Sequence, residues 1–404
     1  MESKAIWIIN QYAGSTDHGM EFRHFYIARE LVSQGHTVSI ISSSYSHLFS
    51  NLPTIKGVYS IENIEGINYC WIKVINYGNA SGWKRVLKWF QFAFRLKGAF
   101  KLLKKESKPD AIFLSSTSPI GVSPTLKMAK ALNAKFIFEV KDIWPLTLVE
   151  VGNKSPFHPL IMLMAYLEKK ALKNADIITS NLSNFGQHIK NMKIDKGFEY
   201  IPNGIDLIQM KNKVPLDKGF DDVIPKNSFV IGYAGTVGVA NALEFVIKAM
   251  NQIKNKNIVL LIVGEGGEKA SLQKEAIEND NIIFVPSVSK SQVQSVISLF
   301  DVCYIGWRAK SLYEFGISPN KLFDYMYSSK PILHSTNTPI DLVALANCGL
   351  SVDAENVTLI KEGILKLYNM SSDKRAELGA NGKKYVEENH PYSELAKKYE
   401  SIVS

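Results

Sequence analysis

A lysine and a carboxylate stand at the beginning of an expected helix in residues 316–333, GISPNKLFDYMYSSKPIL. Lys321 falls in the first turn, where the positive end of the helix dipole disfavours a cation, so another group must offset that cost. An anion bound at the helix N-terminus would do so, and the ammonium would add a charge-assisted hydrogen bond to it. Asp324 follows three residues later on the same face, where it can accept hydrogen bonds from hydroxyl groups such as those of a ribose. The alternative is an exposed Lys–Asp pair that binds no ligand.

Three glycine-containing loops lie between strand-like runs and helices. In the second half, GYAGTVG (232–238) and LLIVGEGGEK (260–269) both run from a strand into a helix, although the latter lacks the dinucleotide fingerprint because Lys269 takes its last glycine position. Two such loops at neighbouring strand ends predict the phosphate or sugar of a nucleotide at that edge. In the first half, Gly19 in the loop 10–25 would let a phosphate approach backbone N–H groups, or is an ordinary turn glycine.

Three charged residues end another strand, in FEVKDIWP (138–145). Glu139, Lys141 and Asp142 at the carboxyl end of a buried strand are costly unless they are solvated or paired. We therefore expect them to line a ligand crevice, with Trp144 at its wall. The alternative is a strand that runs into solvent.

The elements that must position these residues alternate along the whole chain. Apolar, β-branched runs separated by helical patterns indicate parallel sheets covered on both faces. The expected strands are 6–10, 37–43, 110–116, 135–140 and 176–181 in the first half, and 230–235, 258–264, 282–286, 302–306 and 330–335 in the second. The polar stretch 206–228 separates the two series. We predict an α/β protein with two doubly wound Rossmann-like domains facing across a cleft, an N-terminal domain at 1–205, a linker at 206–228, and a C-terminal domain at 229–390.

Length and composition set the class of protein. The chain has 404 residues, of which 46% are hydrophobic and 21% charged, which excludes a disordered or fibrous chain and suits two or three domains. Its three cysteines, Cys70, Cys303 and Cys348, are far apart and form no CxxC or zinc spacing, so we expect a reducing compartment and no structural metal. Neither a signal-peptide pattern nor an apolar run of 18 residues is present in the sequence, which predicts a cytoplasmic protein.

Taken together, the motifs resemble a known family. The segments GHTV (35–38), IPNGID (201–206), AGT (234–236), VGEGGE (263–268) and SPNKLFDYM (318–326) resemble the GT-B glycosyltransferases of family 4, above all the bacterial O-antigen and capsule branch of amino-sugar transferases. The resemblance covers essentially the whole chain in order. It implies retaining transfer from a nucleotide sugar, usually UDP-linked, with no cofactor and no required metal. It also implies a last helix, within 391–404, that crosses back onto the first domain.

The resemblance also assigns residues. Gly19 matches the loop near the diphosphate, Gly264, Glu265 and Gly266 match the loop near the base and sugar, and Asp324 matches the second acid of the Glu-x7-Glu pair. The full donor-binding set it implies is Gly19, Gly235, Thr236, Gly264, Glu265, Gly266, Pro286, Pro319, Asn320, Lys321, Leu322 and Asp324.

The chain departs from the family pattern at three places. The first acid of the pair falls at Gly316, and Glu314 is out of register. The Arg and Lys that often hold the β-phosphate are absent from 236–245, which leaves Lys321 as the candidate for that charge. Many relatives have His where Lys141 stands, so the catalytic contact falls to Asp142 or Lys141. No D-x-D triplet occurs, in agreement with metal independence.

The net charge of +9 is unevenly distributed. Residues 1–205 carry +10 and residues 206–404 carry −1, and nine basic residues against one acidic residue fall within 83–108. Polar positions there recur at helical spacing and aromatic residues fill the rest, a pattern typical of a membrane-surface helix. The predicted membrane contacts are Trp83, Lys84, Arg85, Lys88 and Trp89. The alternative is a helix that packs its aromatic residues on its own sheet and leaves its lysines solvated.

We therefore expect a glycosyltransferase that moves a sugar, an N-acetylated amino sugar, from a UDP-sugar to a lipid-linked oligosaccharide acceptor in surface polysaccharide biosynthesis. It would be peripheral on the inner face of the cytoplasmic membrane and bound to its anionic surface. One alternative is a nucleotide-sugar 2-epimerase of the same architecture, and another is a non-catalytic module that binds glycan or lipid. Nucleic acid is not expected as a partner, because the basic residues lie on one amphipathic helix beside bulky aromatics. The sequence favours no particular oligomeric state.

Overall fold

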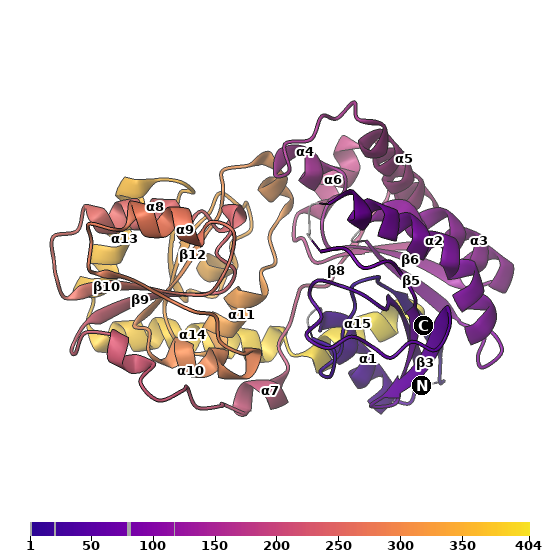
Figure 1. Ribbon diagram of the computed structural model, residues 1–404, viewed down its shortest axis with the longest axis horizontal. Coiled ribbons are helices and arrows are strands. Elements are labelled where there is room, and N and C mark those ends of the chain that lie inside the picture. Colours follow the sequence, from indigo (N-terminus) through magenta and orange to yellow (C-terminus); the bar gives the residue numbers. More distant parts are fainter. Residues whose placement is uncertain (1, 20–21, 79–81, 117) are drawn as a thin grey trace. The chain divides into compact units, whose positions relative to one another are not determined.

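The computed structural model describes residues 2–19, 22–78, 82–116 and 118–404. The chain divides into two compact units, each described here by itself: unit 1 comprises Met1–Pro202 with Tyr392–Ser404, and unit 2 comprises Asn203–Pro391. Each unit is a sheet between layers of helices (Figure 1). The predicted α/β class with two doubly wound, Rossmann-like parallel sheets is confirmed.

Unit 1 contains an eight-stranded sheet in the order β3-β4-β2-β1-β5-β6-β7-β8, in which only the β3–β4 pair is antiparallel. Its strands are β1 (Ala5–Ile9), β2 (Thr37–Ser43), β3 (Tyr59–Ile64), β4 (Ile67–Ile72), β5 (Ala111–Ser116), β6 (Lys135–Val140), β7 (Ile177–Ser180) and β8 (Glu199–Tyr200). Its helices are α1 (Arg23–Ser33), α2 (Trp83–Leu103), α3 (Val122–Leu132), α4 (Leu146–Glu150), α5 (Pro159–Asn174), α6 (Phe185–Asn191) and α15 (Tyr392–Val403).

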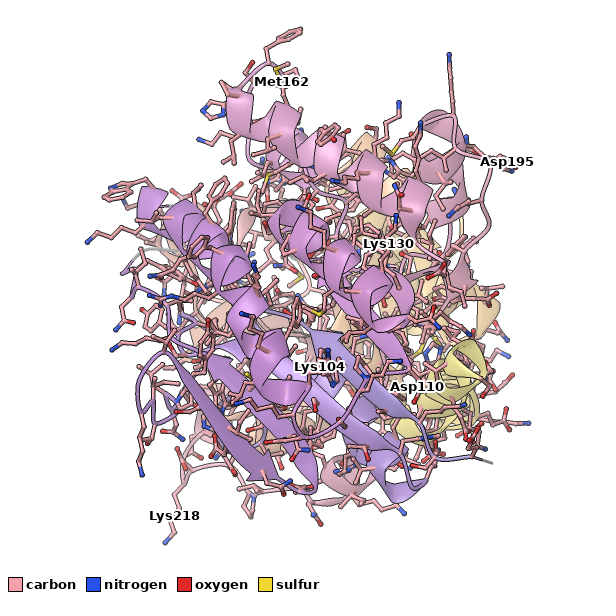
Figure 2. All side chains as sticks on the ribbon, turned by 90° about the vertical axis from the view of Figure 1, so that its right-hand side faces the viewer. Lys104, Asp110, Lys130, Met162, Asp195 and Lys218 are labelled. Atoms are coloured by element: carbon pink, nitrogen blue, oxygen red, sulfur yellow. The ribbon has the colours of Figure 1, made fainter. Side chains whose placement is uncertain are left out.

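Helices cover both faces of this sheet, because its strands are apolar on both sides. On one face α1 and α15 pack together over Ile6 and Ile8, with Tyr26 stacked on Tyr392 at 5.0 Å between ring centroids. On the other face α2, α3 and α5 lie in front of the sheet, where Figure 2 marks them by Lys104, Lys130 and Met162. Alternation along β1 places Trp7 on that side, stacked on Phe100 of α2 at 5.9 Å.

Unit 2 contains a six-stranded parallel sheet in the order β11-β10-β9-β12-β13-β14. Its strands are β9 (Phe229–Ala234), β10 (Ile258–Val263), β11 (Ile282–Val285), β12 (Val302–Gly306), β13 (Ile332–Ser335) and β14 (Gly349–Val352). Its helices are α7 (Leu207–Lys211), α8 (Leu243–Asn251), α9 (Lys269–Glu275), α10 (Val293–Ser298), α11 (Asn320–Tyr327), α12 (Leu342–Leu345), α13 (Val357–Asn369) and α14 (Ser372–Asn389). One core lies under α8 and α13 and a second under α10, α11 and α14, one on each face.

The segment 206–228, predicted as a linker, packs on unit 2. Leu207, Leu216 and Phe220 contact the core under α10 and α11. The carbonyl oxygen of Val214 accepts a hydrogen bond of 2.6 Å from the Ser295 hydroxyl. The polar composition of this stretch predicts exposure, but its scattered apolar residues are enough to hold it against the unit.

Among the described residues, no helix combines the length and the apolar character needed to cross a membrane.

Candidate functional site

The first turn of α11 is braced by a loop from the beginning of unit 2. The Asn203 side-chain amide donates to the Ser318 carbonyl at 2.6 Å, and the Asn203 backbone N–H donates to the Ser318 hydroxyl at 3.2 Å. The IPNGID and SPNKLFDYM motifs therefore meet, and Asn203 fixes the entry to the helix that carries Lys321. Sequence analysis quoted both motifs but gave Asn203 no role.

Lys321 is held by neutral groups. Its Nζ donates to Oη of Tyr233 at 2.6 Å and to Oδ1 of Asn241 at 2.5 Å, and lies 4.3 Å from the centre of the Tyr233 ring. Burial lowers the pKa of this ammonium to about 7. In the described part of the chain no carboxylate lies within 4 Å of it, so the alternative of an exposed Lys–Asp pair is wrong. The group is poised to bind an anion.

Asp324 is paired with a different lysine. Its side chain is 6% exposed, and its two oxygens accept hydrogen bonds of 2.8 and 2.6 Å from Nζ of Lys290. Its backbone oxygen also accepts from Gln294 at 3.1 Å. A carboxylate has further lone pairs, so a ribose hydroxyl can still donate to Asp324. Lys290 could not be predicted as the partner of Asp324, because the two residues are 34 positions apart and no local pattern links them.

The glycine loops after β9 and β10 pack against one another. A Cβ on Gly264, whose φ is +157°, would lie 1.9 Å from the Gly235 carbonyl oxygen, and one on Gly266 would lie 2.1 Å from the Val237 carbonyl oxygen. The N–H groups of Gly235 and Gly264 already donate to Val263 and Val285. Gly235 and Gly264 therefore allow the two loops to pack closely, and their N–H groups are not left for a phosphate. A Cβ on Gly235 would lie 3.3 Å from the Lys321 ammonium.

The other predicted donor-binding residues of unit 2 divide by exposure. Thr236, Pro286 and Asn320 are exposed at or beside the carboxyl ends of the parallel strands, and Pro319 is half-buried ahead of α11. Glu265 is exposed and pairs with Nζ of Lys269 at 2.6 Å. Leu322 is 1% exposed in the core and holds α11 in place. Where the chain is described, no group of His, Cys, Asp and Glu could hold a metal ion.

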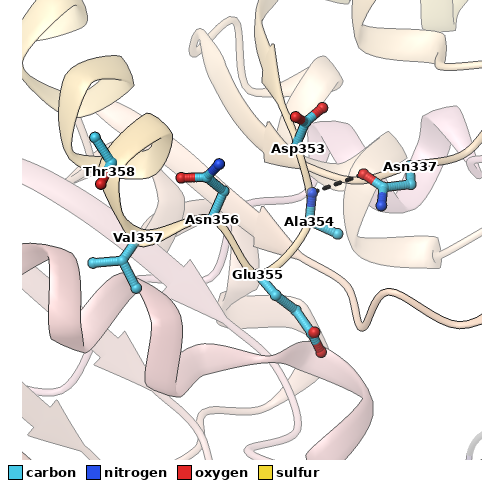
Figure 3. A pocket seen from close by; sticks show the side chains of 7 residues that line it. All are labelled: Asn337, Asp353, Ala354, Glu355, Asn356, Val357 and Thr358. Atoms are coloured by element: carbon cyan, nitrogen blue, oxygen red, sulfur yellow. Dashed lines mark hydrogen bonds between the residues drawn. The ribbon is translucent and has the colours of Figure 1, made fainter.

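An open recess of about 630 Å³ lies at the ends of β13 and β14 (Figure 3). Several of its polar groups are already engaged: the Ala354 N–H donates to Oδ1 of Asn337 at 2.9 Å, Asn356 caps α13, and Glu355 lies 3.6 Å from Arg308. Its lining is Asn337, Asp353, Ala354, Glu355, Asn356, Val357 and Thr358. None of the predicted donor-binding residues lines it.

In unit 1, Gly19 has φ of +99°, a left-handed conformation that favours glycine. Its N–H donates to the Ser15 carbonyl at 2.9 Å, and a Cβ would lie 2.8 Å from Ser50. These contacts explain the glycine by the turn itself.

Glu139 does not line a crevice, which corrects the sequence prediction. Its side chain is 1% exposed and lies 2.6 Å from Nε2 of His24 and 3.3 Å from Arg23, and it also accepts from the Tyr399 hydroxyl of α15. Burial raises the pKa of Glu139, but His24 and Arg23 outweigh burial and hold it well below its usual range. The carboxylate is paired, and it anchors α1 and α15 to the end of β6.

The same network orders the loop after β1. Burial lowers the pKa of His24, and Nε2 of its ring donates to Glu139. Its Nδ1 then accepts from the Asn10 amide at 3.1 Å, and Oδ1 of Asn10 accepts from the Tyr12 N–H at 2.9 Å. The position of Tyr12 therefore depends on Glu139. Beyond the end of β6, Lys141 is half-buried and Asp142 is exposed.

The predicted membrane contacts on α2 separate into two groups. Trp83 is 71% exposed and Lys84 is also exposed, as a membrane contact requires, but Lys88 is 0% and Trp89 4% exposed, and Arg85 is half-buried. For Lys88 and Trp89 the expectation is wrong, because a loop carbonyl and aromatic rings receive these side chains. The outer face of α2 instead carries Leu87, Phe90 and Phe94, of which Phe94 is 86% exposed.

Two family descriptions match the chain: Glycosyltransferase Family 4 over residues 18–209 and Glycosyl transferases group 1 over residues 217–385. WcaI of Escherichia coli (strain K12), named for a glycosyl transferase of colanic acid biosynthesis, is 25% identical over 298 residues, which are 68% of this chain and 69% of that protein.

Solved structures share the fold over the whole chain. Sucrose-phosphate synthase from Thermosynechococcus elongatus matches with a TM-score of 0.75 at 17% identity, covering 99% of this chain and 98% of that chain. WaaG, a glycosyltransferase involved in lipopolysaccharide biosynthesis, matches with a TM-score of 0.68 at 13% identity, covering 99% of both chains. Anabaena Alr3699/HepE, solved in complex with UDP and glucose, matches with a TM-score of 0.67 at 11% identity, covering 100% of this chain and 99% of that chain. The chain thus carries the two domains of a GT-B glycosyltransferase, a family 4 domain in its first half and a group 1 domain in its second.

Proposed function

We propose that this glycosyltransferase uses a UDP-sugar as donor and binds its diphosphate at Lys321. The observation that carries the proposal is the setting of that lysine: a half-buried side chain whose ammonium donates to the neutral oxygens of Tyr233 and Asn241. A diphosphate would supply the missing negative charge. Asp324, with lone pairs left beside Lys290, would accept from the ribose. HepE, solved with UDP and glucose, is a fold relative that supports this choice of nucleotide.

In the proposed reaction, the bond between the sugar C1 and the diphosphate oxygen breaks, and the acceptor oxygen bonds to C1 on the same face. The electron pair leaves with the diphosphate, and the acceptor hydroxyl proton is released. The positive charge of Lys321 would stabilise the departing diphosphate, which is the kind of electrostatic contribution that usually dominates such catalysis. Lys141 and Asp142 remain the proposed catalytic contacts from unit 1. No cofactor or metal takes part in this scheme.

The acceptor is proposed to be a lipid-linked saccharide of a surface polysaccharide such as an O-antigen or capsule, and the sugar an N-acetylated amino sugar. The likeness to WcaI, named for colanic acid biosynthesis, supports a surface polysaccharide. The resemblance of the motifs to those of the amino-sugar transferases supports an N-acetylated amino sugar as the transferred group.

A membrane-facing surface on unit 1 fits this acceptor. Its exposed apolar side chains are Trp83, Leu87, Phe90 and Phe94 of α2 and Phe157, Met162, Leu163 and Tyr166 at and before α5. Both helices cover the same face of the sheet (Figure 2). Exposed lysines, among them Lys84, Lys97 and Lys101, accompany the apolar residues. Aromatic groups beside lysines suit an anionic lipid surface, so we place the enzyme peripherally on the inner face of the cytoplasmic membrane.

Calorimetry with UDP, GDP and dTDP tests the donor proposal. UDP should bind, and the Lys321→Met variant should bind it at least tenfold more weakly. Absence of binding by any uridine nucleotide at millimolar concentration would refute a UDP-sugar donor.

Co-sedimentation with vesicles tests the membrane proposal. Binding should rise with anionic lipid, fall with salt because exposed charges are screened, and be lost in a Phe90→Ser, Phe94→Ser variant. Ile277→Ser, which removes an equally exposed apolar side chain from unit 2, is the matched control. Wild-type protein that ignores anionic vesicles at low salt would exclude this surface as an anchor.

A further inference from the structure

A fully buried lysine, Lys88, lies in unit 1 within a set of side chains that we name the Lys88 cluster. Its members are Tyr12 after β1, His47 after β2, Tyr77 after β4, and Arg85, Lys88 and Trp89 in the first turns of α2. Loops that follow parallel strands meet at the carboxyl edge of a sheet, which is where open α/β sheets bind their ligands. The donor proposal assigns no role to these residues.

Lys88 has no counter-charge. Its side chain is 0% exposed, and its Nζ lies 3.3 Å from the Gln11 carbonyl oxygen, 4.0 Å from the centre of the Tyr12 ring and 5.5 Å from that of Tyr77. Throughout the described ranges, no carboxylate comes within 4 Å of this ammonium. A buried ammonium with one long hydrogen bond and two ring faces is an expensive arrangement.

The neighbours of Lys88 add positive charge. Arg85 lies over the rings of Tyr12 and Trp89 at 5.6 and 5.7 Å, and its Nε donates to the Tyr12 hydroxyl at 3.1 Å. Burial and then the charge of Arg85 lower the pKa of Lys88, and burial followed by Arg85 and Lys88 lowers that of His47. Arg85 is half-buried and His47 exposed, so both reach solvent above the buried ammonium.

The N-terminus of α2 adds to the same positive field. The helix is 21 residues long, and its N-cap, Gly82, makes no side-chain capping bond. Its first turn carries no acidic residue. No acidic residue in the first turn of α2 itself offsets the positive end of the helix dipole, which coincides with Arg85 and Lys88.

We propose that the Lys88 cluster binds a phosphate or diphosphate group of the acceptor. The proposal rests on the proposed function, because it assigns the anionic part of the substrate that receives the sugar. The anion contacts Arg85 and His47, which can each donate hydrogen bonds to its oxygens, and lies above Lys88, whose charge it compensates. Tyr12 holds Arg85 and Trp89 in place through its hydroxyl, and Glu139 fixes Tyr12 through His24 and Asn10.

The test measures binding of two probes, farnesyl diphosphate and glucose 1-phosphate, to the full-length protein by calorimetry. Saturating UDP is present so that Lys321 in unit 2 is occupied. Wild-type protein should bind at least one probe, and Lys88→Met and Arg85→Met should each weaken that binding at least tenfold. Lys56→Met, which removes an exposed charge of unit 1 that belongs neither to the cluster nor to the membrane-facing surface, should leave it within twofold. Binding of farnesyl diphosphate alone identifies a lipid diphosphate as the source, and binding of glucose 1-phosphate alone identifies a sugar phosphate.

Failure to bind either probe, or equal losses in Lys56→Met and Lys88→Met, would overturn the proposal. Thermal unfolding provides a second readout, because removing an uncompensated buried charge should raise or preserve the melting temperature in Lys88→Met. A large fall in that temperature, with probe binding unchanged, would show a structural role only. If UDP itself fails to bind, the proposed donor function fails, whereas normal UDP binding with unaltered probe binding in Lys88→Met refutes the Lys88 cluster alone.

Discussion

Replacing Lys321 by Met should move stability and donor binding in opposite directions. The folded protein holds this ammonium with a pKa of about 7 against 10.5 for an ordinary lysine, because burial disfavours the charge. A difference of about 3.5 pH units corresponds to at most about 4–5 kcal/mol of destabilisation. Met fills a similar volume without the charge but loses the hydrogen bonds to Tyr233 and Asn241, each worth about 1 kcal/mol. The net expectation is a gain of about 1–2 kcal/mol, or roughly 2–6 °C in melting temperature.

The gain should depend on pH with a definite sign. Below pH 7 the folded wild type carries the full cost of the charge. Between pH 7 and 10.5 the unfolded chain binds the proton that the folded chain has released, so wild-type stability rises with pH. The advantage of Lys321→Met should therefore be largest near pH 6 and disappear towards pH 9, as followed by thermal unfolding at each pH.

Donor binding should change in the other direction. A charge-assisted hydrogen bond to phosphate is worth about 1.5–3 kcal/mol, so Lys321→Met should weaken binding of a UDP-sugar by roughly 10- to 150-fold. Wild-type affinity should fall above pH 7, by up to about tenfold per pH unit, while the variant shows no such slope. A UDP-sugar is preferable to UDP because both of its phosphates are esterified and do not titrate near pH 7. Lys310→Met, which replaces an exposed lysine shortly before the segment 316–333, is the control. It should change neither the melting temperature nor the affinity for the UDP-sugar. Equal UDP-sugar affinity in the two variants would refute the reasoning.

Two further predictions concern the buried carboxylates. Lys290→Met leaves Asp324 buried without its cation and should lower the free energy of unfolding by about 1–2 kcal/mol. A Lys290→Met, Asp324→Asn double variant should recover part of this loss. Urea titration of the three proteins checks the prediction, and additive losses would contradict it. Glu139→Gln should lower the free energy of unfolding by about 3–5 kcal/mol and expose residues 392–404 to limited proteolysis. The reason is that Arg23 loses its buried carboxylate and α15 loses its anchor. An unchanged digestion pattern would show that the apolar contacts of α15 are enough to hold it.

The sequence predicts ten of the parallel strands, because they are continuous apolar runs of the kind that a sheet buried on both faces requires. It does not predict the short parallel strands β8 and β14, which are not continuous buried apolar runs. It does not predict the β3–β4 hairpin at the edge of the unit 1 sheet, where Glu62 and Asn63 interrupt the apolar pattern. The turn is made by Glu65 and Gly66, both with positive φ, a conformation that a glutamate rarely takes. The positive φ of Glu65, which makes the turn, can be recognised only once the backbone is known.

The candidate site is predicted less completely, because its pairings span long separations. Glu139 finds Arg23, His24 and Tyr399 at distances of 116, 115 and 260 residues along the chain. Periodicity places Lys88 on a polar helix face, yet this position packs inward while Phe94 faces solvent. Helical spacing fixes which residues share a face but not which face meets the sheet. Residue type decides which helix face packs inward only when the surface that receives the helix is uniformly apolar. The surface that receives α2 includes a loop carbonyl and aromatic ring faces, which accept a lysine.

Lys321 and Lys88 follow one physical rule in two separate units. Each ammonium is surrounded by a tyrosine ring within about 4.3 Å and by neutral oxygens, and neither has a carboxylate within ion-pair distance in the described structure. Elsewhere the chain pairs its buried charges, as Glu139 and Asp324 show. Aromatic faces and single oxygens lower the cost of a buried cation without neutralising it, so its field remains available to a ligand. In the proposed reaction the enzyme has two anions to hold, the diphosphate that leaves and the phosphate of a lipid-linked acceptor, and the two lysines without a counter-charge match that requirement one for one.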